Sequence, residues 1–225
     1  MDEITLDLLR EYRNRGFIIA SGSFGTEGAK FAVQPERFLS FAEKDLKRSS
    51  DRNLVNALSN IKRAIDCQMD SLLTGFCLYE RSKKENWKYP RKVETLNRIG
   101  VVSPRILSKI NQKRNLLEHE YELPKREDVK DALDVATLFL HYTSTFLLDM
   151  PNEFHLQDYS DGETAKANKR DGFVGDFEFI FNDKSRSLII IHTTTGGRKL
   201  KEKLVPYDSE EYLDFLRFIL EMGRD

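Results

Sequence analysis

The sequence contains little cysteine, no long apolar run and no excess of either charge, and each shortage excludes a class of protein. Two cysteines, Cys67 and Cys77, are too few for a disulfide framework, and no CxxC pair offers a zinc site. Lysine plus arginine (36) nearly balances aspartate plus glutamate (37), so the net charge of −1 alone does not indicate a nucleic-acid partner. No apolar run approaches the roughly 20 residues of a membrane span. The acidic N-terminus does not resemble a signal peptide. We therefore expect a soluble, cytoplasmic protein with reduced thiols and no membrane partner.

Enough large apolar residues are present to build a core, including 15 Phe and 8 Tyr. Apolar positions three and four residues apart predict helices at about 3–15, 35–48, 54–80, 104–119 and 126–150. Short connections between them favour an antiparallel, up-and-down bundle. The glycine-rich stretch within 17–33 has no GK[ST] sequence, so a turn or hairpin is favoured over a phosphate-binding loop.

The character of the sequence changes after residue 150. The segment 151–172 is polar and poor in aliphatic residues, and it is interpreted as a linker. Alternating Phe177, Phe179 and Phe181, turn signals and a final amphipathic segment predict a small β-hairpin or sheet plus a helix at 173–225. The predicted fold class is therefore mainly α: a helical bundle at 1–150, a polar linker, and a small C-terminal α+β appendage.

The remaining polar candidates in and near this region do not suggest a site. Asp176 and Glu178 alternate with aromatic residues, which is typical of a half-exposed strand rather than a catalytic pair. His141, His155 and His192 are scattered without a second ligand at metal spacing. The sequence therefore predicts structural or surface histidines, no metal and no cofactor.

A strongly basic segment runs from Arg81 to Arg114. It contains eleven lysines and arginines against two glutamates, with aromatic residues among the charges. Aromatic rings can stack on bases while cations hold phosphates, so the segment predicts a nucleic-acid contact. The residues expected to bind substrate here are Trp87, Lys88, Arg91, Lys92 and Lys113. The alternative is a solvated basic face.

A second pattern, R-N-x3-H-x-Y, begins where the basic segment ends. It consists of Arg114, Asn115, His119 and Tyr121 within KRNLLEHEY. The simplest alternative is a helix end, where Arg114 pairs with Glu118 four residues later and the histidine lies near the helix C-terminus.

The motif resembles that of the HEPN superfamily, in the R-x4-H-x-Y variant of HEPN toxins that are paired with a minimal nucleotidyltransferase antitoxin. The resemblance covers roughly residues 35–150, including FLSFAEKDLKRS and the run from Glu94 to Pro124, and excludes the C-terminal appendage. It implies a helical bundle and a metal-independent endoribonuclease, in which the ribose 2′-hydroxyl attacks the adjacent phosphate and leaves a 2′,3′-cyclic phosphate.

The resemblance also implies roles for individual residues. His119 would be the general base or acid. Arg114 would stabilise charge on the phosphate, and Asn115 would orient the histidine or the phosphate. Tyr121 would contact phosphate or carry the hydroxyl that an antitoxin adenylylates. Other HEPN proteins are non-catalytic modules that bind RNA, nucleotide or a partner protein, and this alternative stays open, as does an accidental spacing in a structural helical protein.

Helix geometry bears on how the motif would work. Five residues turn by about 500°, which leaves Arg114 and His119 roughly 140° apart on a regular helix. Either the helix loosens before the histidine, or a second copy of the motif completes the groove. The second arrangement is preferred and predicts a homodimer. RNA is the substrate that the resemblance implies.

Overall fold

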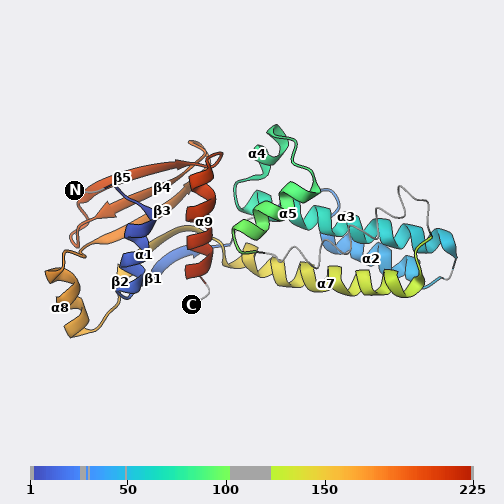
Figure 1. Ribbon diagram of the computed structural model, residues 1–225, viewed down its shortest axis with the longest axis horizontal. Coiled ribbons are helices and arrows are strands. Elements are labelled where there is room, and N and C mark those ends of the chain that lie inside the picture. The colour runs from blue at the N-terminus through green and yellow to red at the C-terminus, as the bar shows by residue number, and fades with distance from the viewer. Residues whose placement is uncertain (1–2, 26–28, 30, 49, 102–122, 224–225) are drawn as a thin grey trace. The chain divides into compact units, whose positions relative to one another are not determined.

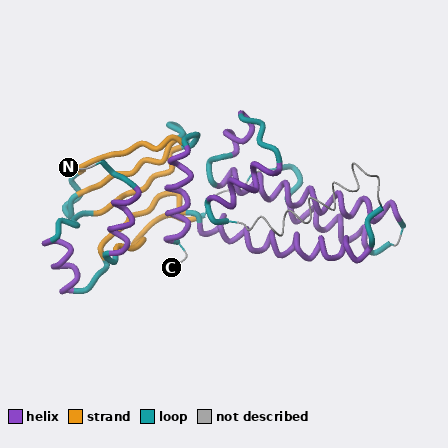
Figure 2. The backbone as a smooth tube through the Cα atoms, in the orientation of Figure 1, coloured by secondary structure: helices purple, strands orange, loops and turns teal. Residues whose placement is uncertain are grey.

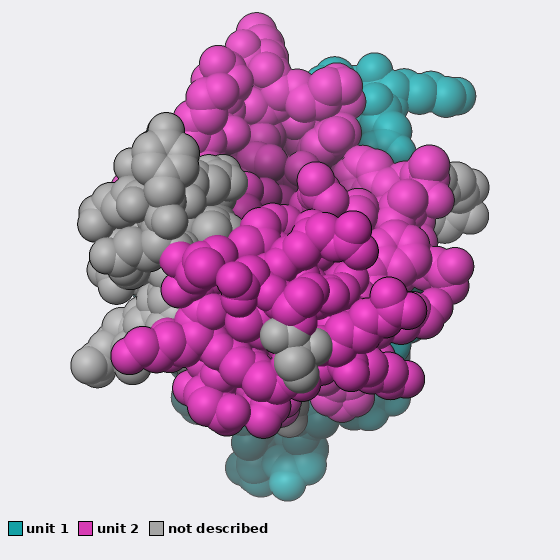
Figure 3. All heavy atoms as spheres, turned by 90° about the vertical axis from the view of Figure 1, so that its right-hand side faces the viewer, with its two compact units in different colours: residues 1–26, 148–225 teal, residues 27–147 magenta. Residues whose placement is uncertain are grey.

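The computed structural model describes residues 3–25, 29, 31–48, 50–101 and 123–223. The chain divides into two compact units, which are coloured separately in Figure 3. One unit combines both ends of the chain, residues 1–26 and 148–225, and the other consists of residues 27–147.

The first unit is built on a five-stranded antiparallel sheet whose strands lie in sequence order. Figure 2 draws these strands in orange. The strands are β1 (Phe17–Phe24), β2 (Pro151–Asp158), β3 (Asp176–Asn182), β4 (Ser187–Thr193) and β5 (Lys199–Pro206). Side chains alternate between the two faces of a strand. The apolar set on one face is fully buried: Phe17, Phe154, Leu156, Phe177, Phe179, Leu188, Ile190 and Val205.

Two helices cover this buried face, α1 (Leu6–Asn14) and α9 (Glu210–Met222), as Figure 1 shows. The Tyr12 ring of α1 meets Phe17 and Phe177 edge-on, with centroids 4.7 and 4.8 Å apart. At the opposite edge of the sheet, on the face that the helices cover, Lys203 of β5 pairs with Glu3 and with Glu211 of α9, each at 2.9 Å. Apolar packing and these ion pairs therefore attach both ends of the chain to the sheet.

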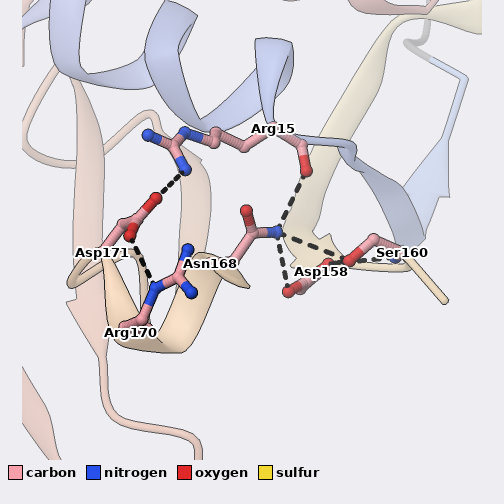
Figure 4. A network of polar contacts seen from close by, with 6 residues as sticks. All are labelled: Arg15, Asp158, Ser160, Asn168, Arg170 and Asp171. Carbon is pink, nitrogen blue, oxygen red and sulfur yellow. Dashed lines mark hydrogen bonds and ion pairs between the residues drawn. The ribbon is translucent and has the colours of Figure 1, made fainter. Parts of the chain in front are cut away.

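A polar network closes the end of this unit at α8 (Gly162–Arg170), and Figure 4 shows its members. The buried Asn168 side chain donates hydrogen bonds to the Arg15 carbonyl at 3.1 Å and to an Asp158 carboxylate oxygen at 3.2 Å. Ser160 also donates to Asp158 through its hydroxyl and its backbone N–H. The network thus holds together the end of α1, the end of β2 and helix α8.

The described elements of the second unit are all helical: α2 (Pro35–Leu46), α3 (Asp51–Gly75), α4 (Tyr79–Lys84), α5 (Tyr89–Arg98) and most of α7 (Arg126–Asp149). Helix α3 carries a continuous buried stripe that includes Ile61, Ile65 and Leu72. Buried Gln68 donates to buried Thr143 at 2.9 Å, which joins α3 to α7. Polar groups buried in this way stay favourable only when they are paired, so this contact aligns the two helices.

The predicted mainly α fold is wrong, because the sheet is the core of a mixed unit rather than a small appendage. The N-terminal helix and glycine-rich segment, assigned to the bundle, belong to this unit as α1 and β1. Strand β1 pairs with β2, more than a hundred residues later, and no local pattern announces such a pairing. At Gly22 an added Cβ would lie 2.6 Å from the Glu153 carbonyl oxygen, so glycine permits the close approach of the two strands.

The segment 151–172, predicted as a linker, forms β2 and α8. Its strand was missed because only Phe154 and Leu156 contribute apolar side chains to the buried face. The other face carries Glu153, His155 and Gln157, which make the segment read as polar. A strand with one solvent-facing side needs few aliphatic residues, and composition alone conceals it.

Candidate nucleic-acid interface

The predicted catalytic motif falls within residues 102–122, outside the described residues. This applies to Lys113, Arg114, Asn115, His119 and Tyr121. The described helices that flank the segment in sequence are α5, which ends at Arg98, and α7, which begins at Arg126. The four remaining predicted binding residues lie on α5 or on the connection that leads into it.

Trp87 lies in the connection between α4 and α5, and only 8% of it is exposed. The guanidinium carbons of Arg81 and Arg91 each lie 5.6 Å from its ring centroid. Its indole N–H donates to a Glu85 carboxylate oxygen at 2.7 Å. That hydrogen bond, helped by the Arg81 guanidinium, lowers the pKa of Glu85 despite some desolvation. The Trp87 ring, predicted to stack on a base, is thus packed within the folded hairpin that helices α4 and α5 form with their connection. Little of its surface is left for a ligand.

Lys92 on α5 is bonded to Asp70 on α3, and the two side chains are only 17% and 22% exposed. Such a half-buried pair positions α5 against α3, because each charge needs the other once water is largely removed. Burial, followed by the nearby Asp66 charge, also raises the pKa of Tyr89 on the same helix. We therefore assign Lys92 a packing role rather than a direct phosphate contact.

Arg91 and Lys88 are exposed to solvent, but their partners differ. Arg91 pairs with Glu94 one turn later at 3.1 Å, a surface contact that a phosphate could displace. Lys88 donates to the neutral Asn86 side chain at 2.9 Å, and no carboxylate partner is found for it in the described part of the chain. Of the four described candidates, Lys88 is therefore the best placed to meet an anion.

Several cations of the basic segment are thus paired with carboxylates in the folded protein. Arg81 bonds Glu85 at 3.0 Å, and Lys83 lies 4.0 Å from Glu80 on the same helix. Lys84 is exposed, like Lys88, without a carboxylate partner among the described residues. Within the described part of the basic segment, Lys84 and Lys88 are therefore exposed lysines for which the structure gives no carboxylate partner.

The structure also brings together a group of residues that the sequence did not connect, on the exposed face of the sheet. One ligating atom from each of Glu153, His155 and Glu178 lies within 4.8 Å of the other two. If the sequence had identified β2 as a strand, the spacing of two residues would have indicated that Glu153 and His155 lie on the same face. The third member, Glu178, could be assigned to the group only from the register between β2 and β3. His155 therefore has the neighbouring ligands that linear spacing did not reveal.

Comparison of the chain with models of protein families, with curated proteins and with solved structures finds no match. Among the described helices, none combines the length and the apolar character that crossing a membrane requires. Function therefore has to be argued from the residues of the chain itself.

Proposed function

We propose that the protein is a metal-independent endoribonuclease of the HEPN type that acts through Arg114, Asn115 and His119. The observation that carries the proposal is the R-N-x3-H-x-Y sequence, placed directly after a basic segment. The flanking helices α5 and α7 belong to a unit whose described elements are all helical, as this type of nuclease requires.

The proposed reaction is an internal transfer at phosphorus. His119 takes the proton of a ribose 2′-hydroxyl as the oxygen attacks the adjacent phosphate. The bond from phosphorus to the 5′-oxygen breaks, and that oxygen leaves with a proton from an acid, for which the second His119 of a homodimer is available. Arg114 stabilises the charge that builds up on the phosphate, and Asn115 orients either the histidine or the phosphate.

Lys88 supports binding rather than chemistry in this proposal. An exposed lysine without a carboxylate partner among the described residues can neutralise a phosphate, which releases counterions. Each such contact on single-stranded nucleic acid contributes about 0.7 to the slope of log affinity against log salt. Lys88→Ala should lower that slope by about this amount and leave the cleavage chemistry unchanged.

The decisive experiment measures cleavage of a mixed RNA substrate in excess EDTA by the full chain. Wild type is compared with His119→Ala and with His141→Ala, which removes an exposed histidine from α7 of the same unit. We expect cleavage by wild type and His141→Ala, cyclic-phosphate product ends, and no cleavage by His119→Ala. Equal cleavage by all three proteins would refute the proposal and indicate a contaminant or another site.

A second experiment measures RNA affinity by fluorescence anisotropy, with a labelled RNA at several salt concentrations. Lys130→Ala is the matched control for Lys88→Ala, because Lys130 is an exposed lysine of the same unit that already pairs with Glu127 at 3.1 Å. RNA binding without any cleavage by wild type would favour the alternative, a non-catalytic HEPN module.

The proposed partners are a second copy of the chain and a nucleotidyltransferase antitoxin. Light scattering at micromolar concentration should give the mass of a dimer, and a monomer would contradict the shared groove. Co-expression with a small nucleotidyltransferase encoded beside this chain, followed by intact-mass measurement, tests whether Tyr121 is adenylylated.

A further inference from the structure

Glu153, His155 and Glu178 form a compact group on the exposed face of the sheet. Glu153 and His155 are two residues apart on β2, so both side chains leave the strand on the same face. Strand pairing places Glu178 of β3 directly opposite His155. Because β2 and β3 are inner strands of the sheet, paired on both sides, their backbone holds the three positions at fixed separations.

The positions that surround the group in the described sheet carry no basic side chain. In the register of the sheet, Ser21 and Ser23 of β1 lie beside β2, Ile180 of β3 lies opposite Glu153, and Ile191 of β4 lies beside Glu178. The next pair along β2 and β3 is Gln157 with Asp176, joined by a hydrogen bond of 3.3 Å. Among the strand residues that the structure describes, no lysine or arginine occupies a position next to the group in this register.

The three side chains are also without partners of their own. In the described part of the chain, no hydrogen bond or ion pair involves the side chains of Glu153, His155 or Glu178. Two carboxylates and an imidazole therefore lie within 4.8 Å of one another with no further side-chain partner among the described residues. A bound cation would place a positive charge between the two carboxylates.

We propose that Glu153, His155 and Glu178 bind a divalent transition-metal ion, with Zn²⁺ as the preferred ion. One imidazole nitrogen with two carboxylate oxygens is a ligand set that suits zinc better than magnesium or calcium, which take oxygen ligands almost alone. Three protein ligands leave the fourth tetrahedral position open to water or to an anionic group.

The distances permit this coordination. Bonds of roughly 2.1 Å to zinc place tetrahedral ligand atoms about 3.4 Å apart. The present separations, all within 4.8 Å, need to close by no more than about 1.4 Å. Rotation of the two glutamate side chains supplies this movement without any change in the backbone, and the exposure of Glu153 leaves the ion a path from solvent.

This site is independent of the proposed ribonuclease. It belongs to the sheet unit, whereas residues 114–121 belong to the helical unit, and the proposed cleavage requires no metal. Cleavage in EDTA and metal binding are therefore separate measurements, and either can fail while the other succeeds.

The test is titration of the chelator-treated full chain with Zn²⁺ alone, by calorimetry and by competition with a zinc indicator dye. We expect one ion per chain for wild type. His155→Ala removes a ligand and should bind at least about tenfold more weakly, because even the loss of a residue that only orients a ligand costs about 10–100-fold in affinity. Glu178→Gln keeps the size of the side chain and should weaken binding to a similar degree, and His141→Ala should bind as wild type does.

X-ray absorption of the loaded protein should give one nitrogen from imidazole and oxygen ligands at about 2.0–2.1 Å. Glu153→Gln changes an exposed residue and serves as the variant that will fold if the others do not. Absence of zinc binding by folded wild type, or binding that none of the three cluster substitutions weakens, would overturn the proposal.

Discussion

Replacing Asn168 with alanine should destabilise the sheet unit far more than a single polar side chain on a nine-residue helix would suggest. The Asn168 residue is 1% exposed. Its amide donates to the Arg15 carbonyl, to Asp158 and, at 3.4 Å, to the Ser160 hydroxyl (Figure 4). The substitution removes the donor and leaves in place three acceptors, one at the end of α1, one at the end of β2 and one in the connection that follows β2.

The magnitude follows from the hydrogen bonds that are lost. A hydrogen bond to a neutral acceptor contributes about 0.5–1.5 kcal/mol, and one to a charged group contributes about 1.5–3 kcal/mol. The two shorter bonds, to the Arg15 carbonyl and to the Asp158 carboxylate, are part-buried, so we expect a loss of about 2–3 kcal/mol in the free energy of unfolding. For a unit of this size, that corresponds to a fall in Tm of about 10 °C or more.

The pH dependence gives a second reading of the same prediction. Burial raises the pKa of Asp158, but hydrogen bonds from Ser160 and Asn168 more than offset it, so the net pKa lies below the ordinary value. A lowered pKa in the folded state stabilises the protein above the unfolded pKa, and the stabilisation is lost as pH falls through the folded pKa. The difference between wild type and Asn168→Ala should therefore be largest near neutral pH and smaller at about pH 3.

Chemical denaturation followed by circular dichroism measures both effects. Arg170→Ala, on the same helix, is the control, because its side chain is 79% exposed and its contact with Asp171 is a surface pair. Asn168→Asp should be at least as damaging as alanine at neutral pH, since it turns a donor into a second carboxylate beside Asp158. Equal unfolding free energies for Asn168→Ala and Arg170→Ala would refute the reasoning.

Four further predictions concern single residues. Gly175→Ala should lower the unfolding free energy by about 3 kcal/mol or more, because a Cβ would lie 1.8 Å from the Thr193 carbonyl oxygen at a φ of +84°. Gly197→Ala, with a φ of +79° and nothing within 4 Å, should lose only about 1–2 kcal/mol in the same denaturation assay. Trp87→Ala should cost about 3–5 kcal/mol by denaturation, and a stability equal to wild type would show that the ring is not part of the core. Burial raises the pKa of the Cys67 thiol to about 11, so iodoacetamide at neutral pH should modify it slowly until the protein unfolds. Rapid modification of the native protein at this position, identified by peptide mass, would contradict that expectation.

Local patterns predicted several elements closely. The apolar stripe of residues 35–48 became α2 at Pro35–Leu46, and the segment begun at about Arg126 became α7 at Arg126–Asp149. The alternating phenylalanines of 177–181 became β3, and the last amphipathic segment became α9. Periodicity works here because each element buries one face, and the spacing of apolar residues records which face it is.

The candidate interface was predictable only in part. Lys88 and Arg91, two of the residues expected to bind substrate, are exposed, since charged side chains remain in water unless they are paired, and their role in binding stays a prediction. It could not reveal that Trp87 is buried against two arginines, because an aromatic residue among cations has the same local pattern in a binding surface and in a folded hairpin.

By itself, the sequence determined where most of the helices and the C-terminal strands lie and which residues they bury. The tertiary structure alone decided that β1 pairs with β2, although the residues of the helical unit separate the two strands in the sequence. This pairing is why the chain forms two units rather than the expected bundle with an appendage. It also decided that Glu178 faces His155. Both outcomes depend on strand pairing between distant segments, whose register is set by packing of the whole sheet and is not written in any local stretch of residues.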